Sequence, residues 1–337
     1  MDTKKVVTFG EVMMRLSAPG YQKIVQTANM EVRFGGSEMN VAASLANLGM
    51  VAKHVTVLPD NLLGKKAKSF IRKLDINTQN VIISGNRMGL YFLEKGASMR
   101  SSQIVYDREN SAFEKLDPDW FDWAEILSDA NWFHWSGITA ALSSSAAKAC
   151  LDAVKMANKL NIPISSDIYF RQGQWKYGKL PTDVLPEIAS YSTVLLANEL
   201  NMRDLLGVEF DEETESFEDA CRKTLQKYPN IKKIVDTDRQ SFSSHHNKIS
   251  SKLFDGSQLY ESETQEITFI IDRVGGGDAF LGGFIYGQLN LDNDLESLNF
   301  GTAASALKHT IEGDFNLASI EEIQNLVSGD ISGRIKR

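Results

Sequence analysis

Three consecutive glycines and an aspartate are the residues of this chain best suited to chemistry. They are Gly275, Gly276, Gly277 and Asp278. Mostly apolar residues at 267–271 precede them, and a helix-forming stretch at 279–289 follows. A strand, a glycine turn and a helix in this order leave backbone N–H groups unpaired at the positive end of a helix dipole, which suits phosphate. A carboxylate there would repel phosphate unless it takes a proton from the attacking group, so the segment indicates phosphoryl transfer to a hydroxyl with Asp278 as the base.

The alternative is a glycine-rich β-turn whose aspartate only caps the next helix. Other glycine motifs do not fit. The dinucleotide-binding pattern needs a glycine where Phe280 stands, no Walker-type loop ending in Lys-Ser/Thr occurs, and protein-kinase catalytic signatures are missing. The stretch from Asp272 to Phe280, an acidic residue followed by glycines and Asp-x-Phe, resembles the C-terminal signature of the ribokinase-like (PfkB) sugar kinases.

In that family the aspartate of the glycine turn is the catalytic base, and the resemblance implies this role for Asp278.

We also expect Gly276→Val to damage phosphate binding more than folding. The reason is that a β-branched side chain would block the approach of a polyphosphate to the turn.

A second glycine motif lies at the start of a predicted helix over 37–48. Its paired glycines let a ligand approach the backbone, and the amide of Asn40 can donate and accept hydrogen bonds with sugar hydroxyls. Ser37 could alternatively be a simple helix cap. The run from Gly35 to Asn40 resembles the family's sugar-binding signature, Gly-Gly-x-x-x-Asn, and implies that Gly36, Ser37 and Asn40 hold substrate hydroxyls.

Four further segments resemble the 2-keto-3-deoxygluconate kinases of that family, and the resemblance covers nearly the whole chain. They are 89–94, 106–108, 169–171 and 313–316. The resemblance adds five substrate-binding residues, among which tyrosines and arginines hold the acid end of the substrate. They are Tyr91, Tyr106, Arg108, Arg171 and Asp314. A sugar acid needs an arginine that a neutral sugar does not, because a hydrogen bond to a charged group contributes about 1.5–3 kcal/mol. On its own, each arginine could be a solvated surface residue and each tyrosine part of a lid core.

The nucleotide site has a weaker signature. The segment 236–242 follows a predicted strand where the family places a loop near ATP, but it lacks the usual glycine. The nucleotide-binding set implied by the resemblance is Asn198, Thr237, Arg239, Ser241, Gly275 and Gly277. Asn201 stands where many relatives carry a glutamate that organises Mg²⁺ through water, so either Glu199 compensates or ATP phosphates and water hold the metal. We expect ATP and Mg²⁺ as cofactors and no metal site built by the protein alone.

Short apolar strands alternate with amphipathic helices along most of the 337 residues. This predicts an α/β fold, with a ribokinase-like, doubly wound and mainly parallel sheet in a single domain over 1–337. Strands are expected at 6–9, 54–58, 131–135, 164–167, 194–198 and 231–236, and helices at 37–48, 65–74, 144–160, 217–228 and after residue 318. The segments 13–33 and 87–113 interrupt this alternation, and the second contains a predicted hairpin around Gly96. We expect these two segments to form a small β lid; the alternative is that they extend the edge of the main sheet.

Composition and charge restrict the partners. A net charge of −8 and a pI of about 5.3 argue against a general nucleic-acid or anionic-membrane surface, so local basic residues must hold anionic substrates. Cys150 and Cys221 have no metal-like spacing, which favours reduced, packed thiols. Strand-like residues from Val6 leave no room for a signal peptide, and no apolar run has membrane-spanning length, so we expect a cytoplasmic protein. A homo-oligomer is also expected, of an order that the sequence does not fix.

The resemblance therefore implies an ATP-dependent kinase that phosphorylates the terminal hydroxyl of 2-keto-3-deoxygluconate to 2-keto-3-deoxy-6-phosphogluconate, with this sugar acid and ATP as partners. Two alternatives stay open. One is another ribokinase-like kinase, acting on fructose, ribose, a nucleoside or a related keto acid. The other is a nucleotide-binding regulatory subunit that has lost turnover, against which the intact glycine turn and Asp278 argue.

Overall fold

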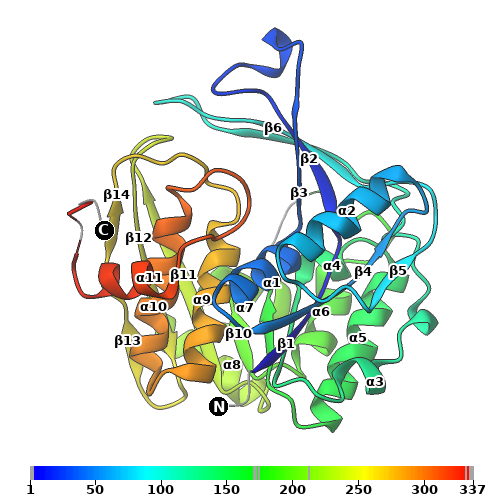
Figure 1. Ribbon diagram of the computed structural model, residues 1–337. Coiled ribbons are helices and arrows are strands. Elements are labelled where there is room, and N and C mark those ends of the chain that lie inside the picture. Colours follow the sequence, from blue (N-terminus) through cyan, green and yellow to red (C-terminus); the bar gives the residue numbers. More distant parts are fainter. Residues whose placement is uncertain (1–3, 170–172, 174, 212, 331, 334–337) are drawn as a thin grey trace.

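The computed structural model describes residues 4–169, 173, 175–211, 213–330 and 332–333 (Figure 1). Its centre is one large sheet with the strand order β13-β12-β11-β10-β9-β8-β1-β4-β5, and β14 also pairs with β12. The strands are β1 (Lys5–Phe9), β4 (Val51–Leu58), β5 (Val81–Ile83), β8 (Trp132–Ser136), β9 (Ile164–Asp167), β10 (Val194–Leu196), β11 (Lys233–Ser241), β12 (Asn247–Phe254), β13 (Leu259–Glu261) and β14 (Gln265–Ile267). All neighbours from β11 to β5 are parallel, whereas β12, β13 and β14 add antiparallel pairs, so the expectation of a mainly parallel sheet is confirmed.

Helices cover both faces of the large sheet, because its strands bury side chains on both sides. Val7 and Phe9 of β1 belong to one apolar core, and Val6 belongs to the other. The first core packs against α3 (Trp123–Leu127), α4 (Gly137–Ala140), α5 (Ser144–Lys159), α6 (Pro181–Ala189), α7 (Glu199–Leu206) and α8 (Phe217–Lys227). The second packs against α1 (Ser37–Asn47), α2 (Leu62–Lys73), α9 (Gly276–Asn290) and α10 (Asp294–Lys308), with α11 (Ile320–Val327) against α10. None of the helices in this described part combines the length and apolar character that a membrane crossing requires.

The two segments that interrupt the alternation supply a second sheet, which projects from the body at the top of Figure 1. Its order is β3-β2-β6-β7, with β2 (Met13–Ser17), β3 (Glu31–Gly35), β6 (Leu90–Glu94) and β7 (Gln103–Asp107). β6 and β7 form the expected antiparallel hairpin, and β2 pairs in parallel with β6. The four strands thus form a sheet of their own instead of extending the edge of the large one. That this sheet acts as a lid remains a proposal.

The expected helices and strands are present within a few residues, but the predicted strand leading into the glycine turn is wrong. β14 ends at Ile267, and residues 268–275 contain neither helix nor strand. The backbone hydrogen bonds of this segment go to other loops instead of a neighbouring strand: the N–H of Ile270 donates to His245 O, and the N–H of Ile271 to His309 O. The helix after the glycines is confirmed, since α9 begins at Gly276.

Candidate active site

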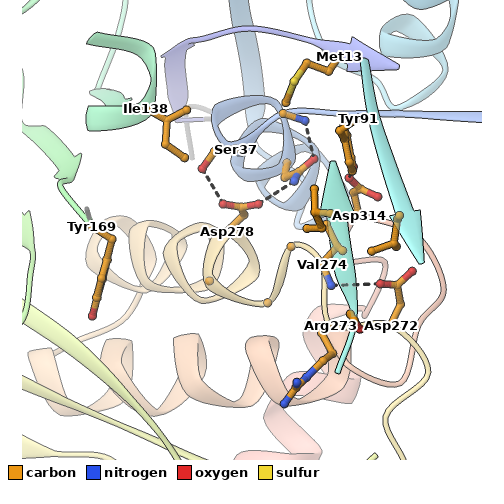
Figure 2. A pocket seen from close by; sticks show the side chains of 18 of the residues that line it. Met13, Ser37, Tyr91, Ile138, Tyr169, Asp272, Arg273, Val274, Asp278 and Asp314 are labelled. Atoms are coloured by element: carbon orange, nitrogen blue, oxygen red, sulfur yellow. Dashed lines mark hydrogen bonds between the residues drawn. The ribbon is translucent and has the colours of Figure 1, made fainter. Parts of the chain in front are cut away.

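A cavity of about 620 Å³ lies between the small sheet and the carboxyl ends of the parallel strands, where α/β folds build their sites (Figure 2). The small sheet contributes Met13 and Tyr91, and α4, which directly follows β8, contributes Ile138. The glycine turn closes the cavity on the α9 side. Nearly all the residues expected to bind substrate line this one space. They are Gly36, Ser37, Asn40, Tyr91, Tyr106, Arg108 and Asp314.

Asp278 lies in the first turn of α9 and is held by two residues of α1. Ser37 Oγ donates to one of its carboxylate oxygens at 2.7 Å, and Asn40 Nδ2 donates to the other at 2.7 Å (Figure 2). The capping alternatives are wrong for both motifs, because the N-caps of α1 and α9 are Gly36 and Gly275. Two segments about 240 residues apart in the chain therefore present one carboxylate to the cavity.

The three glycines of the turn have different surroundings. Gly275 has a φ of 81°, and a Cβ on it would lie 1.9 Å from the carbonyl oxygen of Asp314. A Cβ on Gly276 would lie 2.5 Å from the His309 ring, whereas one on Gly277 would meet nothing within 4 Å. The N–H groups of Gly275 and Gly277 have no acceptor among the residues that the structure describes. The expected effect of Gly276→Val is therefore corrected: that side chain would point into the packed interior, and Gly277 is the glycine open to the cavity.

Asp314 and Tyr91 line the cavity, but their polar atoms bind each other. Asp314 is fully buried and accepts hydrogen bonds from the Tyr91 hydroxyl and from Arg15, a buried arginine of β2 that the sequence did not single out. Arg15 also donates to Asp272 Oδ2 at 2.6 Å, and the other oxygen of Asp272 accepts from Val274 N at 3.1 Å (Figure 2). Burial raises the pKa of Asp314, and the charge of Arg15 opposes this. The network ties the small sheet to the start of the glycine turn.

Arg108 reaches the cavity already paired. Its Nε and Nη2 donate to Glu11 Oε2 at 2.8 and 2.5 Å, and Ser111 donates to the other oxygen of Glu11 at 2.5 Å. The remaining nitrogen of Arg108, Nη1, is buried and has no hydrogen-bond partner among the described residues. The guanidinium also lies 5.8 Å from the ring centre of Tyr106. Arg108 thus keeps one nitrogen available for a ligand that carries negative charge.

Thr237 and Arg239, from the nucleotide-binding set, line the cavity and also a smaller hollow of about 110 Å³ beside it, together with Gly277. Loss of solvent lowers the pKa of Arg239, and the positive charge of Arg273 lowers it further. A bound anion would relieve the repulsion between these two arginines. The other two expected residues have local roles. Asn198 caps α7 by accepting from Asn201 N at 2.8 Å, and Ser241 Oγ accepts from Arg273 at 3.3 Å. Neither is among the described residues of the cavity wall. Arg171 lies outside the described residues.

Glu38 is a further site residue within the motif from Gly35 to Asn40, and the sequence alone assigned it no role. Its side chain is fully buried in the cavity wall and accepts hydrogen bonds from Ser136 Oγ at 2.5 Å and Thr139 Oγ1 at 2.6 Å. Burial raises the pKa of this carboxyl group to about 7, although both hydroxyls oppose the rise. An acidic residue among small and apolar ones in the first turn of α1 was the available signal.

The glycine packing predicts opposite outcomes for two neighbouring substitutions. Gly276→Val should lower the free energy of unfolding by about 1–3 kcal/mol, because the added side chain overpacks against His309. Gly277→Val should keep a melting temperature close to that of the parent and should weaken ATP binding instead. Thermal melts and calorimetric titration with ATP on the pair make the comparison. Loss of ATP binding by a stable Gly276→Val protein would contradict the finding that Gly276 faces His309 and Gly277 faces the cavity.

The buried carboxyl group predicts a pH dependence of stability. The pKa of Glu38 is about 7 in the folded chain and 4.5 as its ordinary value, so the folded state binds more protons between these limits. Stability from this group is present below pH 4.5 and is lost as pH rises through 7. Each pKa unit corresponds to about 1.4 kcal/mol, so Glu38→Gln should gain roughly 2–3 kcal/mol relative to the parent between pH 5 and 8. Denaturant melts of both proteins across that range measure it, and a pH-independent difference would show that Glu38 is ionised throughout.

Comparisons with known proteins agree with this geometry. Residues 3–318 match the pfkB family carbohydrate kinases. A 2-dehydro-3-deoxygalactonokinase of Haloferax volcanii is 28% identical over 331 residues, which are 98% of this chain and 99% of that protein. A 5-dehydro-2-deoxygluconokinase of Clostridium beijerinckii is 25% identical, over 96% of this chain and 92% of that protein.

A solved structure is similar over the same length. The crystal structure of a 2-dehydro-3-deoxygluconokinase from Thermotoga maritima has a TM-score of 0.92 and 42% identity, covering 97% of this chain and 99% of that one. This similarity confirms the ribokinase-like fold expected from the sequence. Fold, cavity and family match coincide: the chain belongs to the pfkB family of carbohydrate kinases.

Proposed function

We propose that this kinase transfers the γ-phosphoryl group of ATP to the terminal hydroxyl of 2-keto-3-deoxygluconate, also called 2-dehydro-3-deoxygluconate. The product is 2-keto-3-deoxy-6-phosphogluconate. The observation that carries the proposal is the carboxylate of Asp278 at the start of α9, held by Ser37 and Asn40 beside an open glycine turn. The names of the Thermotoga and Haloferax relatives support this class of substrate. The Haloferax name also makes the galactonate-derived epimer a second candidate.

In the proposed reaction, Asp278 accepts the proton of the terminal hydroxyl while the hydroxyl oxygen bonds to the γ-phosphorus. The bond from that phosphorus to the bridging oxygen of ADP breaks. The N–H groups of Gly275 and Gly277 and the positive end of α9 stabilise the charge on the transferred phosphoryl oxygens. Ser37 and Asn40 fix the carboxylate so that it faces the hydroxyl.

Opposite ends of the cavity suit the two substrates. Thr237 and Arg239 lie on the side where the smaller hollow continues, which suits the nucleotide. Arg108, with its available Nη1, and Tyr106 lie on the side of the small sheet, which suits a carboxylate. We propose that the small sheet closes over the sugar acid as a lid and excludes water, so that the phosphoryl group is not lost to hydrolysis.

When bound with ATP, Mg²⁺ supplies positive charge that neutralises the polyphosphate. The residues present fit an ion that arrives on ATP, because the described chain has no group of three or more His, Cys, Asp or Glu side chains placed to hold a metal. Mg²⁺ readily takes its ligands from phosphate and water. Glu199 is paired with Lys252 at 3.2 Å, whereas the amide oxygen of Asn201 is buried without a described partner. Of these two residues, Asn201 would be the one with an oxygen available to help hold the ion.

Asp278→Asn tests the base assignment. The substitution keeps the volume, and both contacts to α1 can form if the new amide accepts from Asn40 Nδ2 and donates to Ser37 Oγ. It removes basicity, so kcat should fall roughly 10²–10⁴-fold while ATP binding persists. Ser37→Ala is a graded control, because it removes one hydrogen bond to the carboxylate and keeps the base, so its loss should be smaller. Steady-state rates, calorimetry with ATP and melting temperatures are needed for all three proteins. Near-parental turnover in folded Asp278→Asn would refute the role.

Arg171→Leu tests the substrate class. The role proposed for Arg171 rests on the resemblance and on its place in the sequence, shortly after strand β9. If the guanidinium binds the substrate carboxylate, kcat/KM for the keto acid should fall roughly 30- to 1000-fold, which corresponds to a loss of about 2–4 kcal/mol in transition-state stabilisation. Any weak activity on a neutral hexose should change far less. A screen of sugar acids against fructose and ribose on the parent protein provides the baseline.

Three outcomes would point elsewhere. Equal losses on both substrates would assign Arg171 to ATP or to folding. Higher parental activity on a neutral sugar would favour another ribokinase-like kinase. The absence of turnover with every acceptor, with ATP binding intact, would favour a regulatory subunit.

A further inference from the structure

Lys308 is a buried cation for which the proposed reaction has so far no use. It is the last residue of α10, its side chain has no exposed surface, and it lies behind the glycine turn instead of in the cavity wall. Its ammonium nitrogen donates to the backbone oxygen of Asp272 at 3.0 Å and to that of Ile311 at 3.1 Å. Within the described part of the chain, no carboxylate forms an ion pair with it.

An ammonium group in this position is energetically unusual. A buried charge is costly unless it is paired, and lysine is rarely found fully buried. Burial lowers the pKa of Lys308 to about 8, while the nearby carboxylates of Asp272 and Asp314 raise it. The group therefore keeps its charge at neutral pH through two main-chain carbonyls and the field of carboxylates that are themselves bonded to Arg15.

The two carbonyls belong to the two segments that make the base of the phosphate site. Asp272 begins the glycine turn, and Ile311 lies in the loop between α10 and Asp314. These segments touch closely: the carbonyl of Asp314 fills the space where a Cβ on Gly275 would be. The carbonyl of His309 accepts from the N–H groups of Ile271 and Asp272. The ammonium group of Lys308 therefore joins both segments on the side away from the ligand.

A cation bound to a carbonyl also acts across the peptide. In a trans peptide the C=O and N–H point in opposite directions, so an ammonium group on the Asp272 oxygen polarises the N–H of Arg273 on the opposite side. Arg273, unlike Lys308, belongs to the cavity wall. A positive charge behind the turn thus favours an anion in front of it without touching the anion.

We propose that Lys308 is a positioning residue for phosphoryl transfer, a tethered ammonium ion that holds the Asp272 and Ile311 carbonyls together and keeps the glycine turn in its anion-binding shape. The inference rests on the proposed kinase function and extends it to a residue outside the cavity. The chain carries its own monovalent cation, so the parental rate should not depend on whether K⁺, Na⁺ or NH₄⁺ is the salt cation.

Two substitutions separate charge from volume. Lys308→Met keeps most of the side-chain volume without the charge, and Lys308→Ala leaves a space next to the two carbonyl oxygens. Both should lose roughly 10- to 100-fold in kcat/KM for ATP, the range expected when a hydrogen-bonded charge is removed. Ammonium or potassium chloride should restore at least about tenfold of this in Lys308→Ala, whereas tetramethylammonium chloride at equal ionic strength should not. Lys308→Met should stay unrestored, because its side chain fills the space.

Lys233→Ala is the matched control. It removes an ammonium group bonded to Asp294 and Gln288 at the opposite end of α9, so small cations should not alter its rate or its melting temperature. For Lys308→Ala, the melting temperature and the ATP affinity should both rise in ammonium relative to tetramethylammonium. These readouts separate a cation site from a general packing role.

The proposal is overturned if Lys308→Met keeps the parental kcat/KM for ATP. It is equally overturned if Lys308→Ala responds identically to ammonium and tetramethylammonium in rate, ATP affinity and melting temperature. If Lys308→Ala does not fold, Lys308→Met alone decides. Failure of the parent to phosphorylate any sugar or sugar acid would sink the proposed function instead, and the cation-dependent ATP affinity and melting temperature of Lys308→Ala would still decide the role of Lys308.

Discussion

The carboxylate of Asp278 lies where two helices begin, and the rest of the site depends on how closely those helix starts can approach. α1 supplies the side chains of Ser37 and Asn40, and α9 supplies Asp278 itself. Such an approach requires backbone without side chains at the contact. A Cβ on Gly282 of α9 would lie 2.5 Å from the side chain of Ser44 in α1, so the two helices can pack this closely only because a glycine stands there. The positive ends of two helix dipoles then face one cavity, which favours negative charge there.

Buried charges near this contact fix the position of the small sheet relative to the glycine turn. Arg15 of the small sheet binds the carboxylates of Asp272 and Asp314, one at each end of the base of the phosphate site. A buried ion pair adds little net stability against well-packed apolar residues, but removing one partner leaves an unpaired charge and costs about 3–5 kcal/mol. The network therefore acts mainly as a constraint on geometry. The small sheet and the glycine turn are linked through one guanidinium group, a link that would serve the proposed lid.

The two glycine motifs and most strands and helices could be predicted because short runs of residues determine them: glycines restrict the local backbone, and apolar periodicity marks each buried element. Arg15 and Lys308 could not be found this way, since each is a lone charge within a run of uncharged residues and bonds to Asp272, which is distant in sequence from both. The orientation of Gly276 depends on His309, a residue of another helix end. The strand expected before the turn failed for a related reason: apolar residues suit a strand or a buried loop, and the partners of their N–H groups decide between the two.

The acid end of the substrate faces a constraint of its own. Arg108 gives two of its three nitrogens to one oxygen of Glu11, so it can no longer make the two-pronged contact that a guanidinium normally makes with a carboxylate ligand. What remains is the single nitrogen Nη1, which offers an orienting contact from one side. Glu11 also neutralises much of the charge of this guanidinium before any ligand arrives. A second cation would strengthen the hold on a carboxylate in this cavity, and the resemblance to the sugar-acid kinases makes the arginine of the 169–171 segment our proposed candidate.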